Sequence, residues 1–178
     1  MRLDIISGIY LTEFKKGDET ALVNHLRVKK ISDFTIGIPY PYTRQDACWW
    51  IKNKNQETKQ QKQPVAFAIK QKNGNLIGGI CFDGLKIGKS HKAGLGYWLA
   101  KSYWNRGIMT ACVKVLCMYA FKKFKVIKIF ATCDPDNIGS ERVLKKCGFK
   151  QEGYLSKDHF KNGKYRDSKL FALIKTSE

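Results

Sequence analysis

The chain has 178 residues, of which 43% are hydrophobic, and no apolar run reaches the roughly 18 residues that a membrane-spanning helix needs. Its length suits one domain over residues 1–178, and its six cysteines lack the Cys-x-x-Cys spacing of a zinc site, so we expect no metal and buried, reduced thiols in a cytoplasmic protein. The formal net charge of +18 indicates a polyanionic partner such as a nucleic acid, an acidic protein or a phosphorylated cofactor, although a solvated lysine-rich surface explains it equally simply.

The first third of the chain predicts a short strand and then helices. The strand falls near residues 9–14, and Asp18 fits the N-cap of the helix that follows. Pro39 and Pro41 force an extended, aromatic loop, because proline disfavours helical geometry in the residue before it.

A second helix signal follows this loop. Thr43 fits an N-cap, with Asp46 three residues on, and an apolar stretch comes after them. The polar, Gln- and Lys-rich run at residues 52–64 then predicts the end of this helix and a surface loop.

The centre predicts antiparallel strands. The apolar run "PVAFAIKQ" alternates in the manner of a strand, "KNGN" is a tight hairpin turn, and "LIGGICFDG" is the returning strand. A third strand, "AGLGYWLAK", completes this part.

A helix, a strand, a helix and a hairpin follow. Residues 108–124 place apolar side chains at i, i+3, i+4 and i+7, which predicts an amphipathic helix. The buried strand "VIKIFATC" leads to a short helix in "DPDNIGSERVLKKCGF", where Gly148 is a helix stop. The turn Asn162–Gly163 then joins two terminal strands.

The first of two strand-to-helix junctions, "KSYWNRGIMT", has the layout of an anion site. The first turn of a helix leaves its amide groups free and carries partial positive charge. Gly107 permits a close approach to these amides, and Arg106 adds a positive side chain. One glycine in a turn is also explained by simple chain reversal.

The second junction, in "DPDNIGSERV", adds polar side chains. Asn137 and Ser140 lie three residues apart at a helix start, where both face the same way. Simple N-capping of the helix explains at least one of them, and capping can coexist with ligand contact.

The run from Leu76 to the end of the chain resembles the Gcn5-related N-acetyltransferase (GNAT) superfamily, and within it the RimJ/RimL type. The resemblance rests on "LGYWLAKSYWNRGIMT" and on "DPDNIGSERVLKKCGF", and it is weaker upstream. It departs from the family's phosphate-loop signature at Trp104 and mildly at Met109. It implies an α+β fold: a mixed, mostly antiparallel twisted sheet of six to seven strands, about four flanking helices, and a V-shaped splay between two central parallel strands.

The resemblance also implies acetyl-CoA as the cosubstrate, lying in that V. The segment from Asp83 to Asp134, which contains no acidic residue between these two, would suit its negative charges. The implied contacts are backbone pairing with the pantetheine arm, helix amides on the pyrophosphate, and side chains near the sulfur and the adenosine phosphates. The residues concerned are Trp98, Leu99, Ala100, Arg106, Gly107, Ile108, Met109, Thr110, Asn137, Ser140, Arg142 and Lys145.

The catalytic groups are also implied by the resemblance. The carboxylate that RimL-like enzymes use as a base aligns with His159, whose imidazole can accept a proton near neutral pH, although a histidine in a surface hairpin needs no such role. Ser140 would stabilise the departing thiolate. Tyr40, Tyr42 and Trp49 would line the acceptor cleft, unless the tryptophan belongs to the core.

The expected function is acetyl transfer to a primary amine, most simply a peptide or protein N-terminus such as that of a ribosomal protein. A small-molecule amine acetyltransferase and a non-catalytic CoA-binding module are the alternatives. Nucleic acid is not expected as a substrate, no membrane contact is expected, and the chain is expected to be a monomer or a homodimer.

Overall fold

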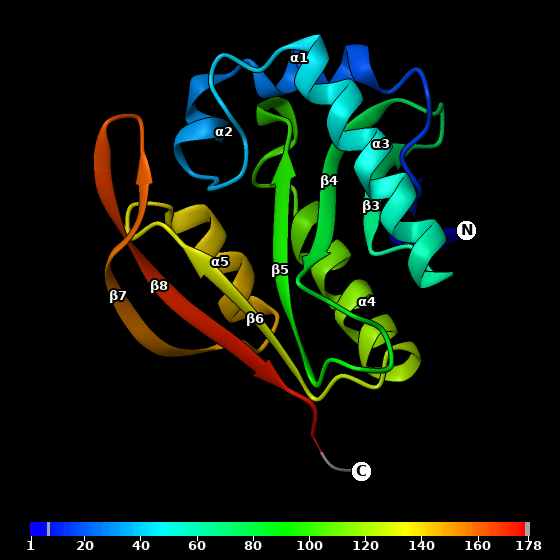
Figure 1. Ribbon diagram of the computed structural model, residues 1–178. Helices are drawn as coiled ribbons and strands as arrows, with labels where there is room; N and C mark the ends of the chain where they lie inside the picture. Colours follow the sequence, from blue (N-terminus) through cyan, green and yellow to red (C-terminus); the bar gives the residue numbers. More distant parts are fainter. Residues whose placement is uncertain (7, 177–178) are drawn as a thin grey trace.

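The computed structural model describes residues 1–6 and 8–176 and contains an eight-stranded sheet with the order β1-β2-β3-β4-β5-β6-β8-β7 (Figure 1). Neighbouring strands are antiparallel except β5 and β6, which are parallel. The strands are β1 (Arg2–Asp4), β2 (Ile9–Thr12), β3 (Ala66–Gln71), β4 (Leu76–Asp83), β5 (Lys92–Leu99), β6 (Lys128–Cys133), β7 (Lys150–Lys161) and β8 (Lys164–Ile174). The helices are α1 (Glu19–Leu26), α2 (Lys29–Asp33), α3 (Arg44–Gln61), α4 (Ile108–Lys123) and α5 (Ile138–Lys146), with a 3₁₀ turn at Lys101–Tyr103.

The α+β class and the mixed sheet are confirmed, but the described residues contain more elements than expected. β1 adds a strand beside β2, with Leu3 paired to Leu11. It is three residues long, too short to show an alternating pattern in the sequence. The five-residue α2 likewise spans little more than one helical turn, so no apolar period marks it.

Helices cover both faces of the sheet (Figure 1). One apolar cluster joins α1 and α3 to the sheet through Leu22, Ile51 and Trp98. The other cluster joins α4 and α5 to the opposite face through Leu116 and Leu144. Because side chains alternate along a strand, neighbouring residues of β5 serve different faces.

The third helix, α3, is longer than the sequence predicted. Thr43 and Asp46 form the expected capping box, with each side chain bonded to the other residue's backbone amide. The helix then continues to Gln61 through the run that we expected to be a loop. Lysine, glutamine and glutamate are good helix formers, and on a surface helix their polarity simply marks the solvent-facing side.

The expected burial of all six thiols is wrong for half of them. Cys112, Cys117 and Cys133 are buried, whereas Cys81 and Cys147 are half-buried and Cys48 is exposed. Cys48 lies on α3, where Ala47 and Ile51 face the core, and the rotation of one residue along a helix turns Cys48 toward solvent.

The splay between the two central parallel strands is present and positions the site. β5 and β6 pair at Lys92↔Lys128, Ala93↔Ile129 and Gly94↔Phe130. Beyond these pairs, β5 stays bonded to β4 as far as Leu99, and β6 stays bonded to β8 as far as Cys133. The two strands therefore separate toward their carboxyl ends and leave a V-shaped opening between them.

Candidate active site

The N-terminus of α4 lies beside this opening and is the candidate anion site. Gly107 is its N-cap in a left-handed conformation, and no side chain caps the helix. The first intrahelical bond runs from Ala111 N–H to the Gly107 carbonyl, which leaves the amides of Ile108, Met109 and Thr110 without a helical partner. Asn105 is also left-handed, with φ of 60°. Alternating backbone conformations of this kind turn successive N–H groups inward, as anion-binding loops do.

Gly107 faces open space. A Cβ built on it meets nothing within 4 Å, and its φ is +74°. Asn105 to Thr110 all line one cavity of about 840 Å³ that runs along the splay. The backbone here is therefore shaped to let a phosphate group approach the helix amides closely.

Trp104, the departure from the family signature, anchors this turn. Its indole Nε1–H donates to the Leu99 carbonyl at 2.7 Å, and its ring packs against both apolar clusters. The bond ties residues 104–107, called the phosphate turn below, to the end of β5. The side chain thus fixes this turn and leaves the helix amides free.

The edge of β5 that faces the opening carries main-chain groups available to a ligand. Ala100 N–H bonds to the Ile77 carbonyl, so the groups of Trp98 also point toward β4, and those of Tyr97 and Leu99 point into the opening. The Leu99 carbonyl is already bonded to Trp104. Three residues, Trp98, Leu99 and Ala100, were expected to pair with pantetheine. Only Leu99 directs a free backbone group, its N–H, into the opening. Tyr97, which the sequence did not single out, directs its N–H and its carbonyl there as well.

Tyr97 also meets Ser140 across the opening. Its hydroxyl lies 2.8 Å from Ser140 Oγ, and either atom can donate the hydrogen bond. Burial raises the pKa of Tyr97, so the phenol keeps its proton. Asn137 Oδ1 accepts from the Ser140 amide at 3.1 Å, which makes Asn137 the cap of α5. Two hydroxyl groups therefore stand together where the strands part.

Basic side chains line the same cavity from the turn before α4 and from two helices, with Lys30 on α2. Arg106 lies in the phosphate turn, and Arg142 and Lys146 lie on α5. Lys145 instead turns to Glu141 on its own helix, at 2.5 Å, and does not line the cavity. The next lysine along, Lys146, takes the place that the sequence led us to expect for Lys145.

His159 on β7 lines the cavity from the opposite side. Its Nδ1 is buried and lacks a hydrogen-bond partner among the described residues, and the nearest carboxylate oxygen is Asp158 Oδ2 at 3.8 Å. Strict alternation would turn Asp158 to the other face of the sheet. The strand is irregular between Leu155 and His159, with Lys157 in a left-handed conformation, and this bulge brings the two side chains together.

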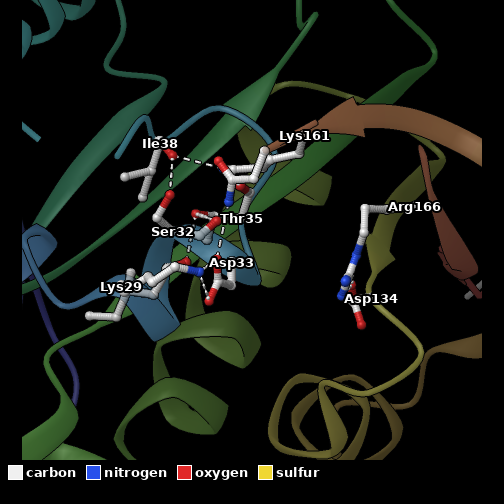
Figure 2. A network of polar contacts seen from close by, with 10 residues as sticks. Lys29, Ser32, Asp33, Thr35, Ile38, Asp134, Lys161 and Arg166 are labelled. Carbon is white, nitrogen blue, oxygen red and sulfur yellow. Dashed lines mark hydrogen bonds and ion pairs between the residues drawn. The ribbon is translucent and has the colours of Figure 1, made fainter. Parts of the chain in front are cut away.

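An ion pair fixes the end of β6 at the rim of the opening (Figure 2). Arg166 on β8 donates from two guanidinium nitrogens to Asp134, which is buried and lines the cavity. The other oxygen of Asp134 accepts from the Asp136 amide at 2.9 Å. Asp134 thereby shapes the turn that leads to Asn137 and Ser140. The sequence signal for this role is an aspartate in "DPDN" directly after a buried strand.

The expected acceptor residues divide between two hollows. Tyr42 lines both the cavity and a second, outer hollow, whereas Tyr40 and Trp49 line the outer hollow alone. Trp50, beside the expected Trp49, also lines both. Burial and the nearby Asp46 carboxylate raise the pKa of Tyr42 to about 12.

Within the described chain, no helix is long and apolar enough to cross a membrane.

Comparison with known proteins agrees with this geometry. The family model described as the acetyltransferase (GNAT) domain matches residues 9–150. The chain belongs to the GNAT family of N-acetyltransferases. YnaD of Bacillus subtilis, an uncharacterized N-acetyltransferase, is 32% identical over 133 residues, which cover 75% of each protein. The ribosomal-protein-serine acetyltransferase of Escherichia coli is 32% identical over 108 residues, covering 60% of this chain and 59% of that one.

A solved structure shares the fold of this GNAT chain almost from end to end. RimL, a ribosomal L7/L12 α-N-protein acetyltransferase in complex with coenzyme A, superposes with a TM-score of 0.86 over 98% of each chain, at 20% identity. The resemblance to the RimJ/RimL type is thus confirmed, and ribosomal-protein acetyltransferases stand among the relatives of this enzyme.

Proposed function

We propose that this GNAT enzyme transfers the acetyl group of acetyl-CoA to the amino terminus of a peptide or protein. The observation that carries the proposal is the continuity of the site. The open edge of β5 at Tyr97 leads directly to the free amides of α4 at Ile108–Thr110. An extended pantetheine arm that ends in a pyrophosphate has that sequence of hydrogen-bonding groups.

Basic side chains within a lining of mixed charge support a phosphate-bearing cosubstrate. Arg106, Arg142 and Lys146 line the cavity, as do four aspartates, and coenzyme A carries phosphates at one end. That RimL was solved with coenzyme A supports the same assignment. Asn137 is engaged in capping α5, so its main contribution is to hold Ser140 in place.

The chemistry is direct attack of the amine on the thioester. The C–N bond forms as the C–S bond breaks, the amine proton passes to His159, and the departing thiolate takes up a proton from water. His159 lines the cavity, and its imidazole is the group that we assign as the base. The Tyr97–Ser140 pair lies where a thiolate would develop, and a hydroxyl group that donates there stabilises it.

The test is a panel of acceptors incubated with acetyl-CoA, with thiol release followed over time and the acetylated atom located by mass spectrometry. The panel contains peptides with free and blocked amino termini, and small amines as the alternative class. Acetylation confined to free α-amines supports the proposal. Turnover of small amines alone, or binding of acetyl-CoA without turnover, would overturn it.

His159 is tested by separating catalysis from cosubstrate binding. A group that takes the amine proton acts on the chemical step, so in His159→Ala we expect a loss of about 10²-fold or more in kcat/KM and an unchanged affinity for acetyl-CoA. Thiol release measures the first quantity and isothermal titration the second. Full turnover in the variant would assign the base to another group.

A further inference from the structure

An exposed aromatic hollow, called the outer pocket below, lies beside the part of the cavity that Tyr42 and Trp50 line. It has a volume of about 510 Å³. Tyr40, Trp49 and Phe160 line it with exposed fractions of 46%, 65% and 65%, and Ile36 is 55% exposed. Large apolar side chains that gather in one exposed hollow mark an interaction site, whereas singly scattered ones do not. The lining residues are Ile36, Gly37, Ile38, Pro39, Tyr40, Tyr42, Asp46, Trp49, Trp50, Phe160, Lys161 and Asn162.

The outer pocket and the cavity share a wall. Residues 36–38, Tyr42 and Trp50 line both, so the two hollows are neighbours on either side of the chain that leads from α2 to α3. His159 faces the cavity, and the next residue, Phe160, faces the outer pocket. Strand β7 therefore contributes one side chain to the cavity and the next to the outer pocket.

A network of hydrogen bonds holds this wall in place (Figure 2). The Lys161 ammonium donates to the carbonyls of Thr35, Ile36 and Ile38. Asn162 donates to Asp33, which also pairs with Lys29. The tip of the β7–β8 hairpin is thus fastened to the loop after α2, and the outer pocket is a built feature of the fold.

The charged and amide side chains of the outer pocket already have partners. Asp46 is bonded to the backbone and hydroxyl of Thr43, Lys161 to three carbonyls, and Asn162 to Asp33. What remains for a ligand is the aromatic and aliphatic surface. The occupant that fits is therefore a large apolar or aromatic group, because it buries this surface and needs no charged partner.

We infer that the outer pocket binds an aromatic or large aliphatic side chain of the acceptor peptide, a few residues after the amino group that is acetylated. The inference rests on the proposed function, and it narrows the substrate class. A small amine fills the cavity alone, whereas a peptide reaches across the shared wall into the neighbouring pocket. The pocket then selects among amino termini by the side chain that follows them.

The experiment uses alanine-rich peptides with a free amino terminus, in which one phenylalanine is moved stepwise away from that terminus. We expect kcat/KM to rise by about tenfold or more at one position of the phenylalanine, relative to the all-alanine peptide. Aspartate at the same position should give no gain. In Trp49→Ala and in Phe160→Ala the ratio between the two peptides should fall toward one.

Met118→Ala is the matched control, because Met118 is a large apolar side chain, 57% exposed, on α4 and outside both hollows. This variant should keep the full ratio. Equal rates for every phenylalanine position would overturn the inference while the proposed function stands. Acetylation of small amines without any peptide would overturn both. A wild-type dimer in sedimentation that Trp49→Ala dissolves would assign the pocket to a second copy of the chain and also overturn the inference.

Discussion

Gly107 combines two properties that a phosphate site needs at a single residue. Its φ of +74° is one that side-chain-bearing residues rarely adopt, and the space before it is open. We predict that Gly107→Val weakens binding of coenzyme A by about tenfold, equivalent to about 1.4 kcal/mol, because the branched side chain would stand in the path of the pyrophosphate. Isothermal titration measures the affinity, and urea unfolding measures the stability.

Gly88 provides the control for backbone strain. It has φ of +77°, also meets nothing within 4 Å, and lies outside the cavity. Gly88→Val and Gly107→Val should each lose about 1–2 kcal/mol of stability, because both place a side chain in the left-handed region. Equal affinities for coenzyme A in the two variants would show that Gly107 is only a turn residue.

The hydroxyls of Tyr97 and Ser140 are predicted to act as one unit. We expect Tyr97→Phe and Ser140→Ala each to lower kcat by about 10²-fold, the effect of removing one donor from a developing negative charge. Because either change breaks the 2.8 Å bond, the double variant should lose little more than the worse single variant. Thiol release under saturating acetyl-CoA measures kcat, and losses that multiply would mean that the two hydroxyls work independently.

The position of Ser140 depends on the contacts that fix helix α5 to the sheet. Glu141 bonds to Lys145 on the same helix and to Lys169 on β8. These two lysines lower the pKa of Glu141 from 4.5 to about 2. The carboxylate therefore ties α5 to the sheet one residue after the catalytic candidate.

This tie predicts a pH dependence of stability with a definite sign. A carboxyl whose pKa is lower in the folded state stabilises the fold fully above its unfolded value. The contribution of Glu141 should be complete above pH 4.5 and disappear as the pH falls toward about 2. Urea unfolding of the wild type and Glu141→Gln at a series of pH values measures it. A difference between the two that stays constant down to pH 2 would contradict the assignment.

The elements that the sequence predicted well are those with a long period or a specific cap. The amphipathic α4, the capping box at Thr43 and the Asn162–Gly163 turn are present because local chemistry decides them. Elements decided by tertiary contacts were missed, as with β1, which is a strand because Leu3 pairs with Leu11. Tertiary contacts also explain why Lys146, and not the expected Lys145, lines the cavity. Which side of α5 faces the cavity depends on how the helix packs against the sheet.

Side chains at irregular backbone were the least predictable part of the candidate site. Asp158 approaches His159 only because of a bulge, and a bulge cannot be read from an alternating pattern. Tyr97 could have been found, since it lies on the strand that precedes the phosphate turn, but its partner Ser140 is 43 residues away. The Lys161 network is likewise formed by segments more than 120 residues apart.

For the whole molecule, the net charge of +18 predicts that binding of coenzyme A weakens as salt is added. Arg142→Gln with Lys146→Gln should reduce this salt dependence, because both side chains line the cavity. The matched control, Lys122→Gln with Lys123→Gln, removes the same charge from the far end of α4. Titration calorimetry at increasing salt checks the slopes. Equal slopes in the two double variants would mean that only the total charge matters.

The opening between β5 and β6 makes the sheet two smaller sheets joined at three residue pairs. Beyond the joint, β5 presents an internal edge whose backbone groups, like those of any edge strand, favour a pairing partner. An extended amide-bearing arm in that gap acts as a substitute strand and links the two halves. Under the proposed function, binding of acetyl-CoA should therefore join the two halves of the sheet, and by mass action the protein should resist unfolding and proteolysis best at high acetyl-CoA concentration.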